Sequence, residues 1–212
     1  MHIEFLLEEE SAEDALSLVL PKILPAHVTF QTHVFSGKAN LKSALPDRLK
    51  GYASWMFADS MTDEYLVVIL IDRDREDCHA LKLELEAIVR NAGLESKTAV
   101  APSQSYQVVN RIAIEELEAW FFGDVEALRT AYPGVPATLS QKQAYRNPDS
   151  IRGGTAESLL RVLQRAGHFA GLKELPKREA ARTIAAQMDP GRNISPSFKL
   201  FYTTLREATG GS

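Results

Sequence analysis

Three acidic residues follow two apolar segments of the sequence, and their spacing suggests that they bind a divalent metal ion. The apolar run Leu66–Ile71 ends in Asp72, with Asp74 two positions further on, and the earlier segment 3–7 ends in Glu8. Residues two apart in an extended chain point the same way, so Asp72 and Asp74 are expected to face one point. Crowded carboxylates repel one another unless a cation lies between them. Because Mg²⁺ (or Mn²⁺) prefers oxygen ligands, the pattern predicts a site for such an ion.

The elements around these acids predict an α/β fold with a mainly parallel sheet flanked by helices. Leu66–Ile71 is apolar throughout, as in strands that are buried on both faces of a parallel sheet. Ligands bind such sheets at the carboxyl ends of the strands, so Glu8 would join Asp72 if their strands are neighbours. Strands are expected at 3–7, 28–35, 66–71, 97–101 and 107–114, and helices at 41–58, 77–92, 155–166, 177–188 and 196–207.

The chain is expected to form an α/β domain over residues 1–105 and a mostly helical extension over 106–212. Its charge is uneven: residues 1–139 carry a net charge of −10, whereas residues 140–212 carry +6. The basic part could contact phosphate groups beside an acidic metal site, or the two surfaces could merely differ in charge. The candidates for phosphate contacts are Arg146, Arg152, Lys177 and Arg178.

Two further features of the second half could bind ions. Glu115 and Glu118 lie three apart on a predicted helix and so share a face, where Glu118 could be a further metal ligand. The alternative is that both acids lie on a solvated surface at the start of a helix, where the helix dipole favours negative charge. Gly153 and Gly154 precede a helix start at Thr155, where backbone N–H groups could bind an anion. A capped turn is the alternative there.

Several other classes of protein are excluded or disfavoured. The sequence contains no phosphate-binding or dinucleotide-binding glycine motif, no metal-binding histidine spacing and only one cysteine. A D-x-D glycosyltransferase stays possible but predicts a larger domain. No run of about 18 apolar residues occurs, so no membrane-spanning helix is expected. The N-terminus turns acidic at once and is not typical of a secretory signal, so a cytoplasmic location is the default expectation.

The motifs also resemble those of a known family. Glu8 after one strand and "DRDRED" after a later one resemble the Toprim motif set of topoisomerases, primases and overcoming-lysogenization-defect nucleases, although Glu9 stands where the common form has glycine. The closer resemblance is to the RloG-like proteins, the Toprim-like domain-of-unknown-function family 4276. It is carried by the segments "EEESAEDAL", "LIDRDREDCHALK", "VVNRIAIEELEAWFFGD" and "MDPGRNISPSF".

This resemblance implies a function and a role for each acid. Asp72 and Asp74 would hold Mg²⁺ (or Mn²⁺), and Glu8 would act as general acid/base or as a further ligand. The substrate would be a phosphodiester of nucleic acid, with DNA favoured over RNA, and an ATPase partner in phage defence is implied. Two alternatives stay open: a metal-dependent phosphohydrolase that acts on a small nucleotide, and a non-catalytic interaction subunit that keeps the fold.

Overall fold

The computed structural model describes residues 1–58, 64–102 and 104–210. Helices and parallel strands alternate in the first half of the chain and helices dominate the second half, so the α/β prediction is confirmed. None of the helices in the described ranges has the length and apolar character needed to span a lipid bilayer.

Contacts within the chain divide it into two compact units. The first unit consists of Met1–Glu10 and Ala26–Ile112, and the second of Ser11–Pro25 and Ala113–Ser212. The domain division expected at residue 105 stays a prediction, because these units are defined by contacts alone.

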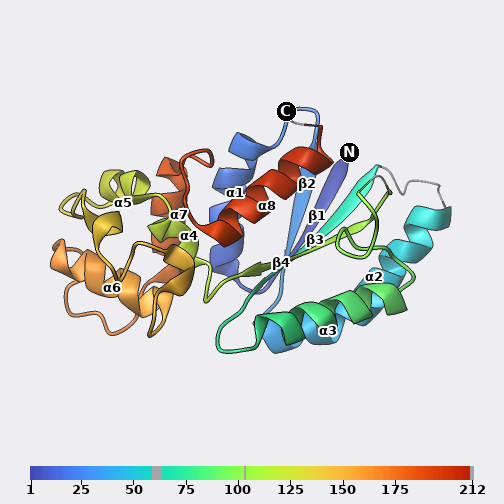
Figure 1. Cartoon of the computed structure of the whole chain (residues 1–212), viewed down its shortest axis with the longest axis horizontal. Helices are drawn as coiled ribbons and strands as arrows, with labels where there is room; N and C mark the ends of the chain where they lie inside the picture. The colour runs from blue at the N-terminus through green and yellow to red at the C-terminus, as the bar shows by residue number, and fades with distance from the viewer. Residues whose placement is uncertain (59–63, 103, 211–212) are drawn as a thin grey trace. The chain divides into compact units, whose positions relative to one another are not determined.

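The first unit is built on a parallel sheet, which has four strands in the described residues. Strand β1 lies between β2 and β3, and its last residue, Leu7, is opposite Val34 of β2 and Leu70 of β3. Helices α2 and α3 run side by side next to the sheet (Figure 1). In sheet order the strands are β2 (Thr29–Val34), β1 (His2–Leu7), β3 (Tyr65–Asp72) and β4 (Val108–Ala113), and the helices are α2 (Lys38–Ala58) and α3 (Cys78–Asn91).

An apolar core joins α2 and α3 to one face of the sheet. The core residues of β3 on this face alternate along the strand, as an extended chain requires. They pack with leucines that recur at helical spacing in α2 and α3. Asp77 directly precedes α3 and caps it, as the sequence predicts. Its carboxylate accepts from the Ala80 N–H at 2.8 Å. The core includes Val67, Ile69, Ile71, Leu41, Leu45, Leu49, Leu81 and Leu85.

The strand expected at 97–101 is wrong, whereas the strand expected at 107–114 is confirmed as β4. The chain at 97–101 forms turns, and Ser96 makes only an isolated bridge with Val108. Val108 and Val109 of β4 are buried. The more apolar segment therefore takes the place beside β3, and Lys97 and Thr98 stay nearer the surface.

The second unit is mostly helical, and the helices expected at 155–166, 177–188 and 196–207 are confirmed. Its core contains an aromatic cluster, in which Trp120 lies 5.2 Å from Phe198 and 5.0 Å from Phe201 between ring centroids. The elements are α1 (Glu10–Ile23, which joins the two units in sequence), α4 (Glu118–Phe122), α5 (Val125–Ala131), α6 (Thr155–Arg165), α7 (Lys177–Gln187), α8 (Pro196–Ala208) and the short turns η1 (Leu139–Gln141) and η2 (Pro148–Ser150).

Candidate functional site

Glu8 and Asp72 lie together at the carboxyl end of the sheet. Glu8 follows β1 directly and Asp72 is the last residue of β3, which pairs with β1. The backbone N–H of Asp72 donates to Glu8 Oε2 at 3.2 Å. In the order β2-β1-β3-β4, the chain adds β2 on one side of β1 and then β3 on the other side, so the strand order changes direction between β1 and β3. Open α/β sheets bind their ligands at such a switch point, so the two acids occupy the expected place for a functional site.

Asp74 has a different environment from Asp72. Strand β3 ends at Asp72, and the following residues form a turn closed by the Glu76 N–H to the Arg73 carbonyl at 3.1 Å. Asp74 itself has a left-handed backbone, with φ of 52°. The alternation of an extended strand therefore does not set the direction of its side chain. Its carboxylate instead lies 2.7 Å from the ammonium group of Lys38.

Lys38 supplies a positive charge to this turn and is a residue that sequence reasoning missed. Its Nζ lies 2.7 Å from Asp74 Oδ2 and 2.9 Å from Glu76 Oε1, and donates to the Arg73 carbonyl at 3.2 Å. Burial alone would lower the pKa of this ammonium, but the bonds to Asp74 and Glu76 raise it above its ordinary value. Its place was available in the sequence, because Lys38 follows β2, whose carboxyl end meets the same edge of the sheet.

The surroundings of Glu8 favour a cation beside it. Burial raises the pKa of the Glu8 carboxyl above its ordinary value, the N–H of Asp72 and the charge of Lys38 oppose this rise, and Asp74 and Glu9 add to it. The ionised carboxylate is therefore destabilised where it stands, and a bound cation would favour it.

At the carboxyl ends of β1 and β3, Glu8 and Asp72 are the carboxylates considered for a metal ion. In residues 1–58, 64–102 and 104–210, no three His, Cys, Asp or Glu side chains are placed to hold one ion together. Mg²⁺ commonly takes one or two carboxylates and completes its shell with water and substrate phosphate oxygens. Glu8 and Asp72 would supply the two carboxylates of such a site, whereas Asp74 would first have to leave Lys38.

The other predicted site residues belong to the second unit. Glu118 is 1% exposed, and its Oε1 lies 3.6 Å from Lys177 Nζ, which also lies 3.7 Å from Glu116. Arg178, another predicted phosphate contact, pairs with Asp14 of α1 at 2.7 Å. Both cations thus have acidic neighbours, whereas the other two predicted contacts, Arg146 and Arg152, are exposed.

The start of α6, whose backbone N–H groups are a candidate anion site by sequence, holds a carboxylate of the chain itself. Glu116 Oε2 accepts from the N–H and the hydroxyl of Thr155, both at 2.9 Å, and from the Ala156 N–H at 3.0 Å. Burial alone would raise the pKa of the Glu116 carboxyl. The bonds from Ala156 and Thr155 and the charge of Lys177 lower it below its ordinary value.

Glu116→Gln is expected to lower the melting temperature at pH 7 by about 2–4 °C, which corresponds to about 1 kcal/mol for a chain of this size. A lowered folded-state pKa means that the ionised carboxylate stabilises the fold above the unfolded-state pKa, and that this contribution is lost as the pH falls through the folded-state value. The difference between variant and wild type should therefore shrink in thermal scans as the pH falls below the ordinary range of a carboxyl group, about pH 4. Glu157→Gln, an exposed change in the same first turn of α6, is the control. A deficit that stayed constant with pH would contradict the assignment.

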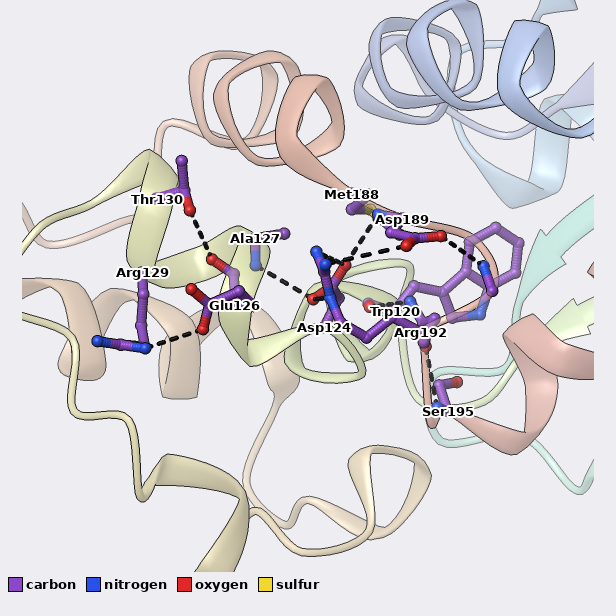
Figure 2. Close-up of polar contacts among 12 residues, drawn as sticks. Trp120, Asp124, Glu126, Ala127, Arg129, Thr130, Met188, Asp189, Arg192 and Ser195 are labelled. Carbon is purple, nitrogen blue, oxygen red and sulfur yellow. Dashed lines mark hydrogen bonds and ion pairs between the residues drawn. The ribbon is translucent and has the colours of Figure 1, made fainter.

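Two of the segments that carry the family resemblance meet at Asp124, as Figure 2 shows. This buried carboxylate caps α5 by accepting from the Ala127 N–H at 3.1 Å. It also accepts from the Asp189 N–H at 2.9 Å and from Arg192 Nε and Nη2 at 2.7 and 2.9 Å. The "WFFGD" and "MDPGRN" segments are thus joined by hydrogen bonds within the second unit, which gives Asp124 and Arg192 a structural role.

Position 123, directly before Asp124, has no room for a side chain. A Cβ at this position would lie 1.9 Å from Asn193 Oδ1. Asn193 cannot easily give way, because its Nδ2 donates to the Trp120 carbonyl and its Oδ1 accepts from the Ser195 N–H. The close approach of the two segments therefore requires glycine.

Comparison with known proteins gives a family for most of the chain. The family model described as Domain of unknown function (DUF4276) matches residues 7–206. Neither the curated proteins nor the solved structures that were compared with the chain gave a match. The matched range includes Glu8, Asp72 and both segments that meet at Asp124. The chain therefore belongs to the DUF4276 family.

Proposed function

We propose that the chain is a Toprim-like enzyme that cleaves phosphodiester bonds of nucleic acid with Mg²⁺ or Mn²⁺, working with an ATPase partner in phage defence. The observation that supports this proposal is the pairing of Glu8 and Asp72 at the switch point between β1 and β3. Acids at that place in a parallel sheet can hold a metal ion against a substrate phosphate. The resemblance of the "DRDRED" segment to a Toprim motif supports the same chemistry.

In this proposal the side chains of the protein would bind the metal ion and transfer protons. Asp72 and Glu8 would hold the ion, and Asp74 would join them by leaving Lys38. The bound ion would polarise the phosphodiester and lower the pKa of a water molecule. Burial raises the pKa of the Glu8 carboxyl, and Glu8 would act as general acid/base if it does not itself bind the ion. Lys38 would keep neutralising Glu76, which lies 2.9 Å away.

One observation favours a second candidate, a non-catalytic interaction subunit. The ammonium of Lys38 already neutralises Asp74 and Glu76, so this part of the acidic cluster is stable without a metal. A subunit that keeps the fold for binding alone would use Lys38 in this structural way. Metal binding separates this candidate from the enzyme, because it is required only for catalysis.

Metal-dependent cleavage of plasmid DNA tests the proposal. The purified protein, alone and with a partner ATPase, is expected to nick or linearise plasmid in the presence of Mg²⁺ or Mn²⁺ and to lose this activity when EDTA is added. Titration calorimetry with Mn²⁺ in the absence of DNA measures metal binding separately. No metal binding and no cleavage would favour the interaction subunit. Hydrolysis of nucleotides that outcompetes plasmid cleavage would favour a small-nucleotide phosphohydrolase.

A further inference from the structure

The second unit contains a cavity of about 450 Å³ that is distinct in composition from the acidic site. It lies beside the start of α6, and Arg152 precedes this helix while Arg161 is within it. The polar and aromatic residues that line it are Gln143, Tyr145, Ser150, Arg152, Ser158 and Arg161.

The two arginines give this cavity a positive charge that is not taken up by an ion pair in the described residues. In the described part of the chain, neither Arg152 nor Arg161 forms an ion pair, and none of the lining residues is acidic. Other arginines of the second unit do have acidic partners, as in the pairs Arg129–Glu126, Arg178–Asp14 and Arg192–Asp124. A concave surface with uncompensated guanidinium groups attracts anions.

Two serine hydroxyls add hydrogen-bond donors to the same cavity. Ser158 is only 2% exposed, and its Oγ accepts from Arg161 Nη2 at 2.7 Å. Ser150 Oγ accepts from Asn147 Nδ2 at 2.8 Å. In both bonds the oxygen is the acceptor, so each hydroxyl keeps a proton for which the described residues provide no acceptor. The bond that Arg161 donates to Ser158 also holds the guanidinium at the wall of the cavity.

An aromatic ring stands next to these donors. Tyr145 stacks on Phe122 with ring centroids 5.2 Å apart and an angle of 4° between the planes. Phe122 is fully buried, so it holds the Tyr145 ring in place at the cavity wall. A flat ring beside arginine and hydroxyl donors matches a ligand that combines an oxyanion with a planar base, because bases stack on aromatic side chains.

We propose that this cavity binds a phosphate group of a nucleotide unit, with its oxygens held by Arg152, Arg161 and the hydroxyl of Ser158. Guanidinium groups match the spacing of phosphate oxygens, and several donors suit a tetrahedral anion better than a carboxylate. The inference rests on the proposed function for the source of the phosphate, which would be a nucleic-acid strand. The cavity would then hold the substrate at a point supplied by the second unit.

Binding measured without metal tests this cavity separately from catalysis. Fluorescence anisotropy with a labelled single-stranded oligonucleotide in EDTA should give a Kd that rises about 10-fold in Arg161→Gln and in Arg152→Gln. Arg165→Gln, the same change at an exposed residue outside the cavity on α6, should leave the Kd unchanged. Circular dichroism and thermal scans check that the exposed arginines can be replaced without unfolding.

The outcomes separate this inference from the proposed function. Equal Kd values for wild type and Arg161→Gln, or an equal loss in Arg165→Gln, would overturn the cavity assignment even if DNA is cleaved. Intact wild-type binding with a specific loss in Arg161→Gln would support it even if no cleavage occurs. Competition separates the sources of the phosphate. Displacement of the oligonucleotide by mononucleotide or inorganic phosphate at similar concentrations would overturn the nucleic-acid source, whereas much weaker displacement supports it.

Discussion

The Asp72→Asn variant is expected to lose Mn²⁺ binding and to cleave DNA at least about 100-fold more slowly than the wild type. Asp72 is 8% exposed, ends β3 and lies beside Glu8, because its backbone N–H donates to Glu8 Oε2. Asparagine keeps its shape and can keep its polar contacts but lacks the negative charge that the ion requires. The fold should therefore remain while the metal site is lost. Calorimetry with Mn²⁺ and plasmid cleavage measure the two effects.

Asp77→Asn is the matched control for this prediction. It makes the same chemical change five residues further on, where Asp77 caps α3 through the Ala80 N–H, and asparagine is an equally good cap. This control should bind Mn²⁺ and cleave plasmid like the wild type. Glu8→Gln should share the defect of Asp72→Asn. If Asp72→Asn and Glu8→Gln both kept full activity, or if Asp77→Asn lost as much, the site assignment would be refuted.

The sheet and the pairing of Glu8 with Asp72 follow from local features of the sequence. An apolar run such as Leu66–Ile71 is buried wherever it forms a strand, and parallel strands place their following residues at one edge. Only the neighbouring position of β1 and β3 had to be assumed. Helices α6, α7 and α8 were equally accessible, because their apolar spacing is local. The helix expected to place Glu115 and Glu118 on one face is wrong in extent, because α4 begins at Glu118 and Glu115 has a φ of 64°.

The surroundings of the acids depend on contacts between distant segments, which the sequence pattern does not contain. Lys38 reaches Asp74 across 36 positions of the chain. Arg178 and Asp14 are separated by 164 positions, and their pairing removes a cation that looked available for phosphate. The turn at Asp74 could not be predicted from the sequence either, because a positive φ at a non-glycine residue depends on tertiary contacts. Charge counts alone therefore overestimate the number of arginines that can meet a ligand.

The Asp124→Ala variant is expected to destabilise the protein by about 3 kcal/mol, which corresponds to a fall in melting temperature of about 6–12 °C. The side chain of Asp124 is fully buried and accepts four hydrogen bonds, from Ala127, Asp189 and twice from Arg192 (Figure 2). Alanine would remove the cap of α5 and leave two backbone N–H groups and a guanidinium without their acceptor. Because the Arg192 side chain is 44% exposed, water compensates part of that loss.

A graded series shows whether the buried network is the cause. Asp124→Asn keeps an acceptor for the cap of α5 but loses the charge that faces Arg192, so its melting temperature should lie between those of Asp124→Ala and the wild type. Glu126→Ala removes an exposed pair with Arg129 on the same helix and should cost less than about 0.5 kcal/mol. Urea and thermal unfolding measure all three variants. If Asp124→Ala were as mild as Glu126→Ala, the hydrogen bonds of Asp124 would not hold the two segments together, and the acid would then need a role outside the fold.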